Sequence, residues 1–134
     1  MTILYADDDS EDREIFAEIL EEIDPEISLV EASDGRETIN ILAQGILPDL
    51  IFLDINMPRL NGEETLVEIR KDKRFKNTKV VIYSTAVNQK SIESYLTLNA
   101  EFLLKPYSVQ DGVSKLRYVI EQFSAKVKSF HKGR

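Results

Sequence analysis

The amino-acid sequence alternates five times between a short apolar run and a longer segment with apolar residues at helical spacing. One run, Leu50–Leu53, is apolar at every position, as expected for a strand that is buried on both faces of a sheet. Repeated alternation of strands and helices predicts a parallel sheet with helices on both faces. We therefore expect an α/β fold, a doubly wound (βα)5 domain with a five-stranded parallel sheet.

The expected elements fill most of the chain. The strands are expected at 3–6, 27–30, 50–53, 80–83 and 102–104. The helices are expected between Asp9 and Pro25, at 36–43, at 63–70, at about 90–98 and after Ser108. Either Asp9 or Ser10 can cap the first helix, and Pro25 ends it.

Length and composition limit the classes of protein that need to be considered. The 134 residues suit one domain, and the absence of cysteine excludes disulfides and thiolate chemistry. The formal net charge of −7 argues against a general nucleic-acid binder. The first residues, MTILYADDD, lack the features of a signal peptide, and no stretch approaches the ~20 apolar residues that span a bilayer. We expect a cytoplasmic protein with no membrane partner.

The chain is expected to comprise one domain at 1–125 and a basic C-terminal tail at 126–134. The basic residues of the tail are Lys126, Lys128, Lys132 and Arg134. We interpret the tail as the solvated end of the last helix. A DNA-binding regulator would need an appended helix-turn-helix domain, and the twelve residues after Gln122 are too few for one. Direct DNA binding is therefore not expected.

Polar side chains follow four of the five expected strands. They are Asp7, Asp8 and Asp9 after the first strand, Asp54 after the third, Ser84 and Thr85 after the fourth, and Lys105 with Pro106 after the fifth. In an open parallel sheet, ligands bind outside the carboxyl ends of the strands, so we expect these groups to converge. Three carboxylates at close range require a cation, and oxygen ligands suit a hard ion such as Mg²⁺.

The same set of residues suits phosphoryl transfer to a carboxylate. Asp54 could act as a nucleophile and form an aspartyl phosphate. Asp8 and Asp54 could hold the metal, while Lys105 could supply a fixed positive charge and Thr85 a hydroxyl donor. We interpret Ser84 as a strand-end residue with no phosphoryl contact.

Other acidic residues near the N-terminus have a simpler interpretation. Asp9, Glu11 and Asp12 are typical of helix capping and of a solvated first turn. Asp54 is different, because an unpaired carboxylate at the end of a wholly apolar strand is costly to bury.

These residues resemble the response-regulator receiver family, in particular its chemotaxis-regulator-like, stand-alone members. The matching pieces are Asp7-Asp8, Asp54 within Leu53-Asp54-Ile55-Asn56-Met57-Pro58, Gly62, Thr85-Ala86 and Lys105-Pro106. The resemblance extends from about Thr2 to about Gln122. It implies a flavodoxin-like fold with strand order 2-1-3-4-5.

The resemblance also implies roles for the acidic residues. Asp54 would accept a phosphoryl group from a phosphohistidine on a partner kinase. Asp8 and Asp54 would ligate Mg²⁺ directly. The main-chain carbonyl of Asn56 would be a further ligand, and Asp7 would act through water.

Four other residues receive roles by the same resemblance. Lys105 would pair with the phosphoryl oxygens, and Thr85 would move to meet them. Phe102 stands where relatives have an aromatic residue, often Tyr, that follows this movement. We expect its packing role to be present and any hydroxyl-dependent contact to be absent. Pro106 would follow a cis peptide bond.

The implied partners are a sensor histidine kinase or phosphotransfer protein and a downstream protein. The downstream protein would bind a face formed by the fourth helix, fifth strand and fifth helix, where Tyr95, Tyr107 and Tyr118 are candidate exposed aromatics. A homodimer is left open. The resemblance implies a switch and not an enzyme, with at most slow Mg²⁺-dependent self-phosphorylation and self-dephosphorylation.

Two alternatives need weighing against the switch. A Mg²⁺-dependent phosphatase with an Asp nucleophile commonly needs a second acid two residues later, where this chain has Asn56. A receiver-like scaffold that is never phosphorylated would not need the complete acid, Thr and Lys set. The segment KDKRFKNTK at 71–79 is similar to a loop in small single-domain regulators that serve sensor kinases, including phytochrome-type kinases.

Overall fold

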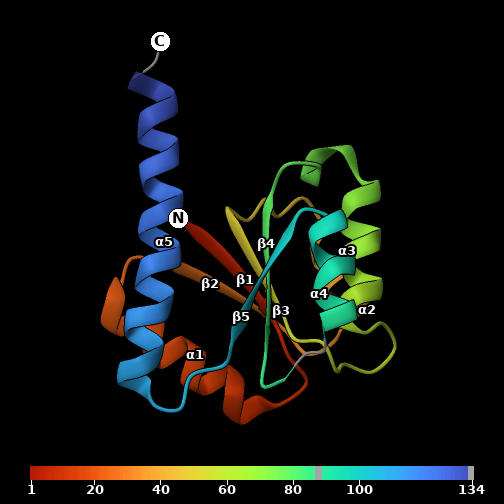
Figure 1. Ribbon diagram of the computed structural model, residues 1–134, viewed down its shortest axis with the longest axis horizontal. Coiled ribbons are helices and arrows are strands. Elements are labelled where there is room, and N and C mark those ends of the chain that lie inside the picture. Colours follow the sequence, from red (N-terminus) through yellow and green to blue (C-terminus); the bar gives the residue numbers. More distant parts are fainter. Residues whose placement is uncertain (87–88, 133–134) are drawn as a thin grey trace.

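The computed structural model describes residues 1–86 and 89–132 of the chain (Figure 1). The strands are β1 (Thr2–Ala6), β2 (Ser28–Ala32), β3 (Leu50–Leu53), β4 (Lys79–Ser84) and β5 (Ala100–Leu104). The helices are α1 (Ser10–Ile23), α2 (Gly35–Ala43), α3 (Gly62–Lys71), α4 (Gln89–Thr97) and α5 (Val109–Lys132), with a short 3₁₀ helix η1 (Lys73–Phe75).

The five strands form one sheet in the order β2-β1-β3-β4-β5, and all neighbouring strands are parallel. This arrangement confirms the predicted doubly wound, flavodoxin-like fold. The fifth strand begins two residues earlier than its sequence predicts, because Ala100 already pairs with Val80 of β4.

Helices cover both faces of the sheet (Figure 1). On one face, Phe16 of α1 and Leu116 of α5 pack against Phe52 of β3. On the other face, the buried side chains of α2, α3 and α4 pack against Ile51 and Leu53. Successive residues of β3 therefore enter opposite cores, which explains why this strand is apolar at every position.

Side-chain caps fix where three of the helices begin. Of the two predicted candidates, Asp9 and not Ser10 caps α1, and it accepts hydrogen bonds from the main-chain N–H groups of Glu11 and Asp12. Asp34 caps α2, and Asn61 caps α3 in a reciprocal capping box with Glu64. All three caps lie in loops that connect a strand to the next helix.

The last helix extends beyond the predicted domain boundary. Residues 126–132 of the predicted basic tail continue α5, and residues 133–134 lie outside the described residues. Within the described residues, no helix combines the length and the apolar character needed to cross a membrane.

Candidate functional site

The sheet register brings the acidic residues together at the carboxyl edge. Ala6 of β1 pairs with Leu53 of β3, and the N–H of Asp54 donates to the carbonyl of Ala6 at 3.0 Å. Asp7 and Asp54 therefore follow adjacent strands at the same level. Carboxylate oxygens of Asp7, Asp8 and Asp54 lie within 4.8 Å of one another. Asp7 and Asp54 are buried and Asp8 is exposed, so the cluster opens to solvent on one side.

Asp7 is wholly buried and accepts hydrogen bonds on both oxygens. Its Oδ1 accepts from the N–H of Asp9 at 2.9 Å. Its Oδ2 accepts from the hydroxyl of Tyr5 and from Nζ of Lys105, the latter at 2.6 Å. Burial, and then the hydrogen bond to Asp7, raise the pKa of Tyr5, so this hydroxyl keeps its proton and acts as a donor.

Lys105 is a cation in direct contact with the acidic cluster. Its main-chain N–H donates to the carbonyl of Ser84 at 2.8 Å, which extends the pairing of β5 with β4. Its ammonium lies 2.6 Å from Asp7, 2.8 Å from Asp12 and 3.6 Å from Oδ1 of Asp54. Burial lowers the pKa of Lys105, but hydrogen bonds to Asp12 and Asp7 and the charge of Asp54 outweigh it, so the pKa is raised. Lys105 therefore remains charged.

Asp54 stands in an environment that disfavours its ionised form. Burial raises the pKa of its carboxyl group, and the charge of Asp7 raises it further. Lys105 and a hydrogen bond from the Ser84 side chain act in the opposite direction but do not cancel the rise. A bound cation would stabilise the ionised form of such a carboxyl group.

The buried hydroxyl beside Asp54 belongs to Ser84 and not to Thr85. Ser84 is only 2% exposed and its side chain hydrogen-bonds Asp54, whereas Thr85 is exposed. The prediction that Ser84 makes no phosphoryl contact stays a prediction, but in this structure Ser84 lies closer to the site than expected. Adjacent side chains of an extended chain point to opposite sides, so only one of the two neighbouring hydroxyl groups, that of Ser84 or that of Thr85, can face the site.

Gly62 makes room for the backbone that follows β3. A Cβ atom on Gly62 would lie 2.3 Å from the main-chain oxygen of Asp54. The N–H of Gly62 donates to the carbonyl of Ile55 at 2.8 Å, which closes the loop onto the start of α3. Arg59 in this loop has a left-handed backbone, with φ of 69°, and forms an ion pair of 2.9 Å with Asp34. Asn56 is exposed in the same loop.

The peptide bond before Pro106 is trans, as is every peptide bond among the described residues. The prediction of a cis bond was therefore wrong. The hydrogen bond from the Lys105 N–H to β4 and the ion pairs of its side chain hold Lys105 in the site with the bond in the ordinary trans form.

The residues predicted to transmit a signal lie on α4, β5 and the segment from β5 into α5. Phe102 is partly buried and packs against the core on the α4 side of the sheet. Of the three candidate exposed aromatics, Tyr107 and Tyr118 are 96% and 65% exposed. Tyr95 is buried in the core, so it contributes to packing and not to the surface.

Three residues at the site escaped the sequence analysis in this role: Tyr5, Asp12 and Ser84. Tyr5 could have been found, since Asp7 follows it by two residues directly after β1, where the chain is still extended, and the two side chains so point to the same side. Asp12 looked like an ordinary acid in the first turn of a helix. Only the packing of α1 beside the end of β5 brings it to Lys105.

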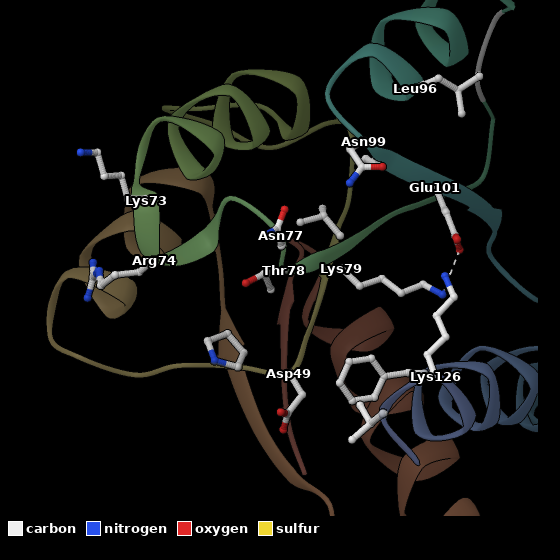
Figure 2. Close-up of a pocket in the computed structure, with 15 residues that line it drawn as sticks. Asp49, Lys73, Arg74, Asn77, Thr78, Lys79, Leu96, Asn99, Glu101 and Lys126 are labelled. Atoms are coloured by element: carbon white, nitrogen blue, oxygen red, sulfur yellow. Dashed lines mark ion pairs between the residues drawn. The ribbon is translucent and has the colours of Figure 1, made fainter. Parts of the chain in front are cut away.

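A groove of about 880 Å³ lies at the opposite end of the sheet, among the residues that precede β3, β4 and β5 (Figure 2). Asp49, which lines it, precedes β3, whereas Asp54 follows β3. Two of its cations already have acidic partners: Lys79 pairs with Glu101 at 3.3 Å, and Arg74 with Asp72 at 2.7 Å. Because the groove lies where the strands begin and the acidic cluster lies where they end, the two are separate.

The fold and the acidic cluster beside a lysine define a doubly wound α/β domain with its charged site at the carboxyl edge of the sheet. A family model described as the response regulator receiver domain matches residues 3–117. The chain belongs to this family, whose members are signalling switches of two-component systems and not classical enzymes.

Two curated relatives show where such domains occur. The sensor histidine kinase CheAY of Helicobacter pylori is 35% identical over 111 residues, which cover 79% of this chain and 13% of that protein. The nitrate/nitrite response regulator NarL of Escherichia coli K12 is 36% identical over 94 residues, which cover 69% of this chain and 42% of that protein. The chain thus spans less than half of the length of these relatives.

Solved structures of similar size match almost end to end. The chemotaxis protein CheY4 of Vibrio cholerae has a TM-score of 0.76 and 26% identity, covering 88% of this chain and 97% of that chain. The phosphorylated cyanobacterial phytochrome response regulator RcpA has a TM-score of 0.78 and 29% identity, covering 91% of each chain.

The donor set of the acidic cluster fits a hard divalent cation. All of its side-chain ligands are carboxylate oxygens, and receiver domains generally bind Mg²⁺ at such an acidic pocket. The raised pKa of Asp54 has burial and a neighbouring carboxylate as its main causes, and a cation would offset both.

Proposed function

We propose that the protein is a phosphorylation-dependent switch of a two-component phosphorelay, with Asp54 as the phosphoacceptor. One observation carries the proposal. The Asp54 carboxylate lies within 4.8 Å of the oxygens of Asp7 and Asp8 and 3.6 Å from the ammonium of Lys105. Acids that need a cation, next to a fixed positive charge, are the elements that phosphoryl transfer to a carboxylate requires.

In the proposed reaction, an oxygen of Asp54 attacks the phosphorus of a phosphohistidine on a kinase or phosphotransfer protein. The N–P bond of the donor breaks as the O–P bond of the aspartyl phosphate forms, and the leaving imidazole takes up a proton. Lys105 pairs with the phosphoryl oxygens. Its raised pKa keeps it charged at neutral pH, which supports this role.

Bound Mg²⁺ would supply positive charge that offsets the carboxylates and the phosphoryl oxygens. Asp8 and Asp54 would hold it directly, the main-chain carbonyl of Asn56 would be a further ligand, and Asp7 would act through water. The indirect role of Asp7 is supported by its existing hydrogen bonds, which occupy both of its oxygens.

The hydroxyl that meets the phosphoryl group is proposed to come from Ser84, with Thr85 as the alternative. Ser84 is buried and bonded to Asp54, whereas Thr85 is exposed. A bond between this hydroxyl and the phosphoryl group would tighten the end of β4. Phe102, packed in the core beneath α4, would then shift and transmit the change.

The output would pass through protein contacts on the face formed by α4, β5 and α5. Large apolar side chains on this face are exposed to solvent, and they are Leu96, Leu104, Tyr107 and Tyr118. Exposed apolar side chains on this face support a downstream protein partner.

The test is the intact mass of the protein after incubation with acetyl phosphate, with and without Mg²⁺. Wild type should gain one phosphoryl group only when Mg²⁺ is present, and Asp54→Asn should gain none. A gain that persists in Asp54→Asn would reject Asp54 as the acceptor. Rapid turnover of many equivalents of acetyl phosphate would favour a phosphatase instead.

A further inference from the structure

Asp12 makes a contact with Lys105 that acceptance of a phosphoryl group does not require. Oδ2 of Asp12, in the first turn of α1, lies 2.8 Å from Nζ of Lys105. The Lys105 side chain is 11% exposed and that of Asp12 is 33% exposed, so Asp12 is on the solvent side of the ammonium. Asp12 is not a member of the acidic cluster formed by Asp7, Asp8 and Asp54.

The contacts of Lys105 set its distance from the acceptor. An ammonium group has three N–H donors, and two of them are engaged by Asp7 and Asp12. The remaining distance, 3.6 Å to Oδ1 of Asp54, is too long for a hydrogen bond. A phosphoryl group on Asp54 would bring roughly −1.5 to −2 of charge, which Lys105 must approach. Asp12 competes for the same ammonium and also repels the incoming charge.

We infer that Asp12 is a positioning residue that holds Lys105 away from Asp54 and thereby limits how readily the site accepts a phosphoryl group. This inference rests on the proposed function. It assigns to α1 a restraining element that is separate from the acids expected to hold the metal.

A role confined to helix stability would be shared by other acids in the first turn of α1. Glu11 is the matched case, because it is exposed, it is adjacent to Asp12, and its main-chain N–H bonds to the same cap residue, Asp9. Glu11→Gln removes one negative charge from the same turn, as Asp12→Asn does. The two variants therefore separate the contact with Lys105 from the general effect of charge on the helix.

The experiment compares wild type, Asp12→Asn, Asp12→Glu and Glu11→Gln in two assays with Mg²⁺ present. The first titrates beryllium fluoride, a phosphoryl mimic that does not turn over, and follows binding by amide NMR. The second measures the rate of mass gain at increasing acetyl phosphate, which separates the half-saturating concentration from the maximal rate. Thermal unfolding of each variant checks that all four proteins are folded.

Asp12→Asn is expected to bind beryllium fluoride about two- to fivefold more tightly, the scale of a partly exposed ion pair, and to half-saturate at correspondingly lower acetyl phosphate. Glu11→Gln should match wild type, and Asp12→Glu should lie closer to wild type than Asp12→Asn does. Equal affinities in Asp12→Asn and Glu11→Gln would overturn the inference. Weaker binding in Asp12→Asn would also overturn it, since Asp12 would then orient Lys105 for the reaction.

The proposed function and this inference fail in different ways. If wild type neither gains a phosphoryl group nor binds beryllium fluoride, the proposed function is rejected and the inference with it. If wild type does both and the variants do not differ, only the inference is rejected.

Discussion

The hydroxyl of Tyr5 donates a hydrogen bond to Oδ2 of Asp7, the oxygen that also accepts from Lys105. Both residues are wholly buried, so neither can exchange its partner for bulk water. Moving a carboxylate from water into the protein interior costs free energy, and hydrogen bonds to the carboxylate offset that cost. If one hydrogen-bond donor is removed, the cost stays and part of the compensation is lost. Tyr5 therefore stabilises the charged site from inside the core.

Tyr5→Phe is expected to lower the free energy of unfolding by about 1 to 3 kcal/mol, because the ring is kept and one hydrogen bond to a charged group is lost. Urea unfolding at neutral pH measures the change. Tyr118→Phe is the control, since Tyr118 is 65% exposed, and its change should stay within about 0.5 kcal/mol. Equal effects in the two variants would show that the bond to Asp7 contributes nothing to stability.

Asp54→Asn is expected to stabilise the metal-free protein at neutral pH. Folding raises the pKa of Asp54, so ionisation of this group favours the unfolded chain. Its unfavourable contribution is absent below the ordinary value of 3.8 and grows as the pH rises from there through the folded pKa. Burial of the charge is the largest cause of the raised pKa, and the charge of Asp7 is the next. The gain at neutral pH should be on the order of 1 kcal/mol, the scale of the interaction between two water-screened charges about 4 Å apart.

Urea unfolding of wild type and Asp54→Asn without divalent ions, at neutral pH and below pH 3.8, tests this dependence on pH. The difference between the two proteins should shrink toward zero in acid. A destabilised Asp54→Asn at neutral pH would mean that Lys105 and Ser84 more than offset the cost of burial and the repulsion by Asp7.

Ser84→Ala is expected to slow phosphorylation by acetyl phosphate more than Thr85→Ala does. Loss of the buried hydroxyl should reduce the rate about tenfold or more, the scale of a hydrogen bond to a charged group. Thr85→Ala serves as the neighbouring control and should stay near the wild-type rate, since Thr85 is exposed. The rate of mass gain gives the comparison, and the opposite order would restore Thr85 as the hydroxyl of the switch.

Arg70 is expected to stabilise the fold at a distance from the acidic cluster. Its guanidinium donates to four main-chain carbonyls, those of Phe75, Thr78, Leu98 and Asn99, at 2.7 to 3.0 Å. These bonds join the end of α3 to the start of β4 and to the turn before β5. Lysine cannot reproduce the fork of donors, so Arg70→Lys should cost about 2 to 3 kcal/mol.

Urea unfolding measures the loss, with Lys71→Met as the control because Lys71 makes a surface ion pair with Glu68. The control should change stability by less than about 1 kcal/mol. If both variants lose the same small amount, the four carbonyl contacts are not a stabilising clamp.

Much of the site could be predicted from the sequence because its members directly follow strands. Once the order and parallel pairing of the strands are known, Asp7, Asp54 and Lys105 must meet at one edge of the sheet. The fully apolar run of β3 and the capping residue Asp9 were similarly local signals, and the structure agrees with both. The contacts of Ser84 and Asp12 at the site could not be predicted from such local signals.

By itself, the sequence determined the alternation of strands and helices and the identity of the charged groups at the strand ends, since period and strand-end position are local properties. Only the tertiary structure decided that Ser84 faces Asp54, that Asp12 reaches Lys105 and that the bond before Pro106 is trans. The physical reason is that a step of one residue reverses the direction of a side chain. Contacts between α1 and β5 depend, moreover, on packing between segments that are far apart in the chain.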